Sequence, residues 1–351
     1  MLFADAGLST SQISVLFAIW SVVSFAFEVP SGALADAWSR RGLYAVGELL
    51  TAAGYALWLI WPSFPGFALG FVLWGLGGAL GSGALEALLY DGLDADGRAG
   101  DYARVSGRAG TVSILAMLAA TLLATPAYAA GGYRLVGILS IATVTLGGLL
   151  ALRLPDNRGT GSEPTDSYLT LLRTGLRESI SSPGMIRAVS VAALLPGFSA
   201  LDEYLPLLAR DAGAATTAVP LWFALTALAM AIGSAAAGRW SVPLPVVLPV
   251  AAILVAAGAL TGRMVPVSAA FGLLQYAIVR AETRLQDAIT GSARSTVLSV
   301  SGFAAEVFAV VLYAWFALPV SLPLLFAACA LPLLATALLG RAGSTLQHGD
   351  R

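Results

Sequence analysis

Carboxyl groups interrupt the long apolar stretches of this sequence at a few positions. An ionised side chain in hydrocarbon costs at least about 2.5–3.5 kcal/mol, so we expect each of these acids to face a cavity or a partner. The chemistry open to such a group is to bind a proton, to bind a cation or to pair with an arginine. The acids are Glu28, Glu48, Glu86, Asp202, Glu203 and Glu306.

Asp202 and Glu203 are the first candidates for proton coupling or for binding a cationic substrate. Adjacent residues of a helix point to different sides, so the protein cannot solvate both of these acids well. Glu306 is the second candidate. At a helical rise of about 1.5 Å per residue it lies about 18 Å from Arg294, near the middle of a membrane.

For the other three acids we favour packing, gating or pairing with arginine over substrate binding. Glu28 stands close to Pro30, where a role in packing or gating is favoured over direct binding. Glu48 and Glu86 lie one or two helical turns from a predicted membrane edge, where pairing with arginines is favoured.

The elements that carry these acids are predicted to be membrane-spanning helices. Of 351 residues, 58% are hydrophobic and 11% are charged, whereas a soluble domain carries about 25% charged residues. The mean hydropathy of +0.83 and the 38 glycines are typical of closely packed transmembrane helices. This composition excludes a disordered chain, a coiled coil and a disulfide scaffold.

Residue counts also exclude several kinds of site. A single cysteine, Cys329, and a single histidine, His348, argue against a disulfide and a metal site, and we expect no cofactor. A net charge of −1 argues against nucleic acid as a partner. The sequence has no HExxH, GxSxG or Walker-type cluster, so it is not predicted to be an enzyme.

Long apolar stretches define the predicted spans. A membrane core about 30 Å thick needs about 20 apolar helical residues per crossing. Eleven stretches meet this requirement and predict an all-α polytopic membrane protein. They are 11–35, 42–61, 66–90, 104–126, 132–153, 187–209, 217–238, 243–262, 265–285, 294–317 and 319–340.

The arginines orient these spans. Sixteen of the nineteen arginines fall on the side that holds Arg40 and Arg41, and only Arg134, Arg210 and Arg263 fall on the other. Because basic residues are retained in cytoplasmic loops, the first side is predicted to be cytoplasmic. Residue 1 is then outside and the C-terminus inside.

A polar stretch divides the spans into five and six. It begins with a Pro/Gly/Ser-rich segment and continues from Ser167 as a predicted short helix on the membrane surface. The predicted organisation is an N-terminal bundle over 1–153, a cytoplasmic linker over 154–186, a six-helix bundle over 187–340 and a cytoplasmic tail over 341–351.

The run from Gly32 to Gly42, GALADAWSRRG, resembles the signature loop of the major facilitator superfamily, G-x-x-x-D-[R/K]-x-G-R-[R/K]. Gly32, Asp36, Arg40 and Arg41 match this pattern, whereas Ala37 replaces a basic residue and Ser39 replaces the second glycine. The resemblance implies a fold of two helical bundles that move a solute by alternating access.

The same resemblance implies a cytoplasmic gate. In the superfamily the signature acid and arginines lock the two halves together, which points to Gly32, Asp36, Arg40 and Arg41. The alternative is that the two arginines only anchor the topology. Two similar cytoplasmic loops suggest a secondary charge network, whose members are Glu86, Asp91, Arg104, Arg108 and Arg294.

The signature loop follows the second helix in the superfamily, so the family's first helix is expected to be missing here, which leaves eleven spans. The residues before the loop resemble a bacterial, drug-efflux-type branch. Drug/proton antiporters of the superfamily usually carry an arginine in helix four and a Gly-Pro motif in helix five. The corresponding spans here lack them, since 66–90 has no arginine and 104–126 has no Gly-Pro, which weakens the prediction of drug/proton exchange.

The functional prediction is a monomeric secondary transporter in the bacterial inner membrane. It is expected to bind a small solute and a proton or another coupling ion, with efflux favoured over uptake. The alternative is a degenerate, non-transporting protein of the same fold that has a binding or regulatory role.

Overall fold

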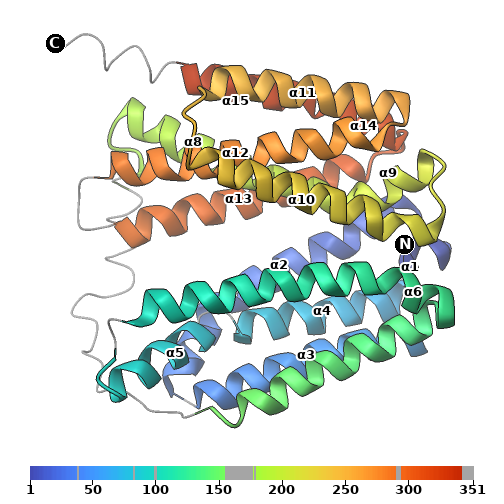
Figure 1. Ribbon diagram of the computed structural model, residues 1–351, viewed down its shortest axis with the longest axis vertical. Coiled ribbons are helices and arrows are strands. Elements are labelled where there is room, and N and C mark those ends of the chain that lie inside the picture. The colour runs from blue at the N-terminus through green and yellow to red at the C-terminus, as the bar shows by residue number, and fades with distance from the viewer. Residues whose placement is uncertain are drawn as a thin grey trace. The chain divides into compact units, whose positions relative to one another are not determined.

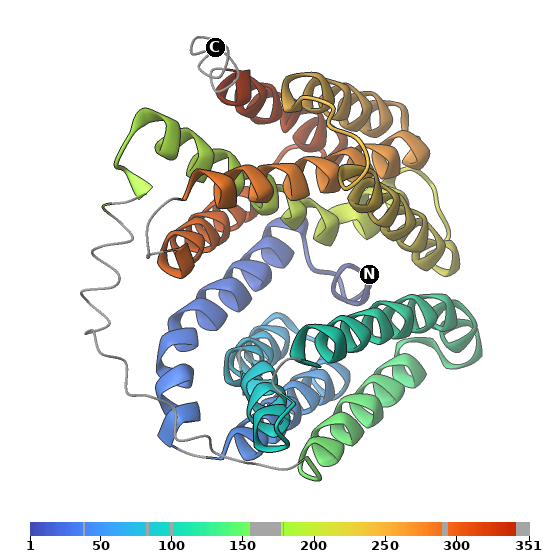
Figure 2. The ribbon, with the colours of Figure 1, turned by 60° about the vertical axis from the view of Figure 1, so that its left-hand side comes forward.

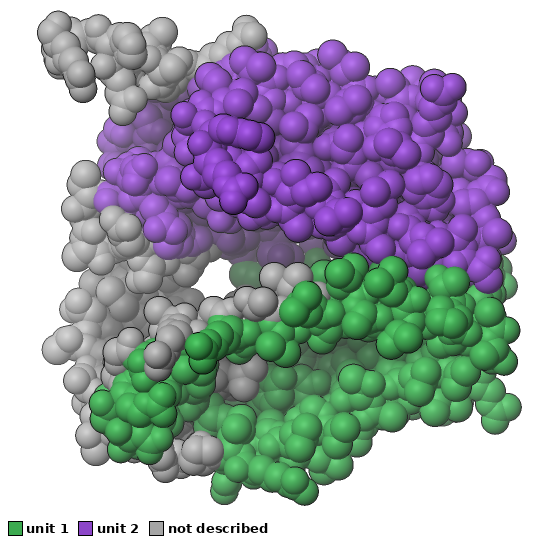
Figure 3. Space-filling model, viewed as in Figure 1, with its two compact units in different colours: residues 1–163 green, residues 164–351 purple. Residues whose placement is uncertain are grey.

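The chain forms two compact units, residues 1–163 and residues 164–351 (Figure 3). The computed structural model describes the backbone of residues 1–37, 39–81, 84–98, 101–154, 177, 179–289 and 294–341. Within these ranges the side chains are described except at 28–37, 84–87, 90–91, 102–104, 106–107, 110–111, 114, 294–296, 299 and 341. Most of the predicted linker and nearly all of the predicted tail therefore lie outside the described residues, and their assignment stays a prediction.

Helices are the regular elements of both units in the described part of the chain (Figure 1). The first unit holds α1 Leu2–Asp5, α2 Thr10–Ala37, α3 Arg40–Ile60, α4 Phe64–Gly81, α5 Ala84–Ala95 and α6 Tyr102–Ala151. The second unit holds α8 Pro183–Gly197, η2 Phe198–Tyr204, α9 Leu205–Asp211, η3 Thr216–Ala218, α10 Val219–Ala237, α11 Leu244–Thr261, α12 Met264–Ala288, α13 Arg294–Phe316, α14 Leu322–Ala328 and α15 Ala330–Arg341.

Nine helical segments of the described residues are long and apolar enough to cross a membrane. The chain is thus a multi-pass membrane protein. The eleven predicted spans differ from this number for two reasons. The spans predicted at 104–126 and 132–153 share α6, and the span predicted at 294–317 contains only a shorter apolar helix, Val300–Phe316. The number eleven stays a prediction.

Two glycines divide α6 into separate helices. Gly131 has φ −155° and ψ 20°, and Gly132 has φ +57° and ψ −155°. A side chain would strongly disfavour the second conformation, which is accessible essentially only to glycine. The chain reverses direction at this point, as Figures 1 and 2 both show.

Glycines bring α3 and α4 into direct backbone contact in the first unit. A Cβ atom added at Gly54 would lie 2.6 Å from the carbonyl oxygen of Gly70, and one added at Gly47 would lie 2.6 Å from that of Gly77. Lipid offers no hydrophobic drive for helix association, so close packing of small residues stabilises such a pair. The two helices run antiparallel, since the residue numbers rise on one as they fall on the other.

In the second unit, α10 and α12 pack in the same way but run parallel. A Cβ atom at Gly233 would lie 1.9 Å from the carbonyl oxygen of Gly272. Nearby, the hydroxyl groups of Thr226 and Ser268 share a buried hydrogen bond of 2.8 Å. The pair therefore combines close backbone approach with a satisfied polar contact, the two features that hold helices together in lipid.

Neighbouring glycines of α4 allow a test of this packing. A Cβ atom at Gly77 would lie 2.5 Å from both the Gly47 carbonyl oxygen and Thr51 Oγ1, whereas one at Gly78 would meet nothing within 4 Å. We expect Gly77→Ala to destabilise the bundle by about 1–3 kcal/mol, as overpacking does. The measurement is the thermal midpoint of the purified protein in detergent. Gly78→Ala is the control and should leave the midpoint unchanged; equal midpoints for both variants would contradict the packing described.

Candidate functional site

The segment Pro183–Asp211 is long enough to span a membrane, but it is not one continuous α-helix. It consists of α8, the seven-residue 3₁₀-helix η2 and α9. The side chain of Ser182 caps its start by accepting a hydrogen bond from the Met185 amide at 3.1 Å, and Pro183 occupies the first turn, where no amide donor is needed. The break therefore lies in the interior of a well-anchored span.

Two prolines flank the break. Pro196 lies at the end of α8 and Pro206 in the first turn of α9. A proline has no amide hydrogen and clashes with the carbonyl of the preceding turn, so each interrupts the α-helical hydrogen bonds. Between them the chain tightens, and the Leu205 amide donates to the Asp202 carbonyl in the 3₁₀ pattern. The prolines thus account for the position of the non-α segment.

The 3₁₀ geometry of η2 places every third side chain on the same face of the helix. Phe198, Leu201 and Tyr204 are each 0% exposed. Side chains three residues apart eclipse one another in a 3₁₀-helix, so these three form one packed face. Asp202 and Glu203 lie off this face and are half-buried. The two acids predicted from the sequence therefore stand together where the helix is irregular.

An aromatic stack fixes the packed face of η2 against α13 and α14. The Phe198 and Phe308 rings meet edge to face with centroids 4.9 Å apart, and the Tyr204 ring stacks on Phe316 at 4.2 Å. Phe316 in turn contacts Phe326 of α14 at 5.1 Å. Such ring pairs contribute about 0.5–1.5 kcal/mol each beyond the area that they bury. The stack holds the backbone of η2 while the acids stay off it.

Glu306 is not on the same face of α13 as this stack. It precedes Phe308 by two residues, which is about 200° around the helix, and its side chain is exposed. Phe308 points to η2, so Glu306 points away from that contact. The sequence ranked this acid second, and the packing places it apart from the first pair.

At the predicted gate, the structure explains one departure from the signature pattern. Ser39, which stands where the superfamily has glycine, caps α3 by accepting a hydrogen bond from the Gly42 amide at 3.1 Å. Arg41 donates from Nη1 to the Leu154 carbonyl at 3.1 Å, just past the end of α6. A cation at a helix C-terminus meets carbonyls without partners in the helix, so Arg41 ties the loop to α6 within the first unit.

The other residues predicted for the gate and the charge network lie on helices, and their roles stay predictions. Glu28, Gly32 and Asp36 belong to α2, Glu86 and Asp91 to α5, Arg104 to α6 and Arg294 to α13, and their side chains lie outside the described residues. Arg108 is exposed on α6. Arg40 begins α3. The gate and the charge network stay predictions.

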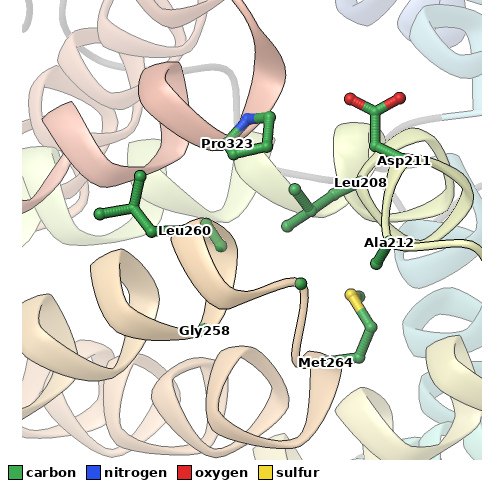
Figure 4. Close-up of a pocket in the computed structure, with 9 residues that line it drawn as sticks. Leu208, Asp211, Ala212, Gly258, Leu260, Met264 and Pro323 are labelled. Atoms are coloured by element: carbon green, nitrogen blue, oxygen red, sulfur yellow. The ribbon is translucent and has the colours of Figure 1, made fainter.

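A small pocket of about 190 Å³ lies at the far end of the same span (Figure 4). Leu208, Leu260 and Pro323 surround it, and the Asp211 carboxylate points away from Leu260. Binding sites for small molecules usually measure about 300–1,000 Å³ and direct a few polar groups inward. This pocket is smaller and mainly apolar, so it does not extend the site at Asp202 and Glu203.

Comparison with known proteins identifies the family. A profile of the Major Facilitator Superfamily matches residues 1–279. The chain belongs to the major facilitator superfamily. Its all-α, membrane-spanning fold, which the sequence predicted, is confirmed. A search of curated proteins returned no match.

Solved transporters have a similar fold. The nucleoside transporter NupG superposes with a TM-score of 0.74 at 13% identity, over 99% of this chain and 93% of that chain. A bacterial homologue of the human lysosomal transporter Spinster, in an inward-facing and unoccupied conformation, gives 0.67 at 15% identity, over 96% and 88%. A bacterial homologue of the iron transporter ferroportin, inward-facing, gives 0.64 at 17% identity, over 97% and 90%. At these low identities, the TM-scores show a shared fold and no more.

Sequence reasoning missed the break and the aromatic stack that supports it. Pro196 and Pro206, ten residues apart in an apolar stretch, were the available signal for the break. The partners Phe308 and Phe316 gave no such signal, because they lie about 110 residues away and apolar rings are common throughout the chain.

The stack should control the stability of this superfamily member. Phe316→Ala removes a ring that contacts both Tyr204 and Phe326, and we expect a loss of about 3–5 kcal/mol, seen as a lower thermal midpoint in detergent. Val311→Ala, on the same helix but 55% exposed, is the control and should change the midpoint little. If the two variants melt at the same temperature, the stack does not hold η2.

Proposed function

We propose that this chain is a secondary active transporter that moves a small solute across the bacterial inner membrane by alternating access, with efflux as its direction. Membership of the superfamily and the division into two compact units support this function. One observation carries the coupling mechanism: a proline-flanked 3₁₀ segment in the interior of a span holds two adjacent acids. Irregular backbone at membrane depth is tolerated where protein buries it or where it lines a cavity.

Protonation is the step that we assign to Asp202 and Glu203. Both side chains are half-buried beside apolar rings, so the cost of keeping them ionised changes when their surroundings change. A proton taken from one side of the membrane removes one charge and favours the state in which the acids are less solvated. Releasing it on the other side reverses this preference, which couples a proton gradient to the exchange of states.

The break offers a place for the span to bend. Met185, Val189 and Ala192 of α8 pack into a cluster with α12 and α13. On the far side of η2, α9 is a separate short helix that starts at Leu205. Missing hydrogen bonds at Pro196 and Pro206 lower the cost of changing the angle between the two parts. The acids lie between them.

A test of proton coupling needs no knowledge of the solute. Spin labels in a Cys329→Ala background would report one distance between Ile60 and Val265 and another between Leu152 and Ile180, all four being exposed positions. We expect the two distances to change in opposite directions between about pH 5.5 and about pH 8, because the gates alternate.

Glu203→Gln removes the proposed titrating group and should make both distances the same at the two pH values. Asp211→Asn, an exposed acid of the same span, is the control and should keep the response. A Glu203→Gln variant that still responds would remove the role of this acid. Distances that never change in the parent protein would favour the degenerate, non-transporting alternative.

The gate proposed at Asp36, Arg40 and Arg41 gives a separate prediction. Asp36→Asn removes the charge that is proposed to hold the cytoplasmic side closed, so the Leu152–Ile180 distance should lengthen at both pH values. Asp94→Asn, an exposed acid of α5, is the control and should have the parent distances. Parent distances in Asp36→Asn would leave Arg40 and Arg41 with only a topological role.

A further inference from the structure

Aromatic rings gather where α2, α3 and α4 meet in the first unit. Neighbouring ring centroids in this cluster lie 4.8 to 6.0 Å apart. Its members are Phe3, Phe17, Trp20, Tyr55, Trp58, Phe67, Phe71 and Trp74. Phe17, Phe67 and Phe71 are buried and pack the bundle, whereas Trp20, Tyr55 and Trp74 are half-buried and form one edge of the cluster.

The two tryptophans of this edge lie deep in their spans. Trp20 is ten residues after Thr10, and Trp74 is ten residues after Phe64, so each lies about 15 Å from the start of its helix. That is half of a membrane core about 30 Å thick. The rings are level, with centroids 5.2 Å apart and planes inclined by 30°. Tryptophans that anchor a protein sit at the membrane surfaces, so anchoring does not explain this pair.

The hydrogen-bonding groups of this edge differ from those of the tryptophan beside it. Trp58 Nε1 donates to the Phe67 carbonyl at 3.2 Å. Within the described residues, the indole N–H groups of Trp20 and Trp74 and the Tyr55 hydroxyl donate no hydrogen bond. Among the described residues, these three donor atoms do not belong to the buried side-chain atoms that lack a partner, so each is accessible to a solute that offers an acceptor.

Among the described side chains, the three that form this edge are uncharged. Glu48 interacts electrostatically with Tyr55, but its Cβ atom packs on α6, 3.0 Å from where a Cβ atom would stand at Gly148. The surface is therefore formed by ring faces and hydrogen-bond donors. Such a surface is suited to a flat, uncharged ring with acceptor atoms on its edge, since stacking supplies attraction and the donors supply orientation.

We propose that Trp20, Tyr55 and Trp74 form a binding platform for an uncharged, planar heteroaromatic solute. The solute extends the Trp20–Trp74 stack, and a nitrogen or oxygen atom on its edge accepts a hydrogen bond from the Tyr55 hydroxyl, which lies outside that stack. This inference rests on the proposed transport function, because it names the class of solute that is carried.

Binding to the purified full-length protein tests the platform without requiring transport. The probes are radiolabelled adenine and uracil in equilibrium dialysis, with ribose as the non-aromatic control. We expect at least one of the two rings to bind and ribose not to bind. Trp74→Leu should weaken binding about tenfold or more, because stacking on one aromatic side chain is lost. Trp74→Phe keeps a smaller stacking ring and should fall between the parent and Trp74→Leu.

Trp61→Leu is the matched control, since Trp61 is exposed at the end of α3 and belongs to no ring contact of this cluster. Its affinity should equal that of the parent. The thermal midpoint of each variant shows that the bundle is folded. The platform is overturned if neither ring binds the parent, or if Trp74→Leu is folded and binds with the parent affinity.

The pH response of the two spin-label distances separates this proposal from the transport proposal. If the distances respond to pH but planar rings do not bind through Trp74, the transporter assignment stands and the platform fails. If planar rings bind through Trp74 but the distances never change, the platform stands and transport fails.

Discussion

A peptide group in hydrocarbon has no water to bond with, so its N–H and C=O groups must find hydrogen-bond partners within the protein. This requirement shapes the membrane-spanning segments of the chain. Each span must satisfy its own backbone, which leaves the helix as the element available to a chain of this composition. Departures from the α-helix are therefore few and locally explained. The glycine pair at Gly131 and Gly132 allows a reversal, and the prolines at Pro196 and Pro206 enclose a segment whose backbone is still bonded in the 3₁₀ pattern.

The same requirement gives the helices different mechanical roles. Where glycines bring backbones into contact, as between α3 and α4 or between α10 and α12, a small shift would cause an atomic clash, so the two helices of each pair resist displacement against one another. The span from α8 to α9 has weaker internal bonding and is held instead by ring stacking on α13 and α14. The alternating access proposed above would need both features, helix pairs that stay together and a span that can bend.

The sequence was sufficient for the fold because average hydropathy over a window does not depend on how helices pack. It also singled out Asp202 and Glu203 as candidates, since the cost of burying charge depends on residue type, and their role stays a proposal. It was not sufficient for features that depend on local geometry or on distant partners. The cap at Ser39 looked like a departure from a pattern, and residue type alone does not bring Trp20 of α2 into contact with Trp74 of α4. In both cases the decisive information was a contact.

The tighter winding of η2 has a consequence for which residues of its span face the protein interior. Glu203 follows Val189 by fourteen residues, so in an uninterrupted α-helix the two would lie within about 40° of each other, and Glu203 would join the buried stripe of Val189 and Ala192. Each 3₁₀ residue turns about 20° further than an α-helical one, which by Glu203 amounts to about 120°. The extra rotation moves a carboxylate off the apolar stripe and puts Leu201 and Tyr204 into packed positions. A change of winding in η2 would therefore rotate that acid relative to the apolar stripe.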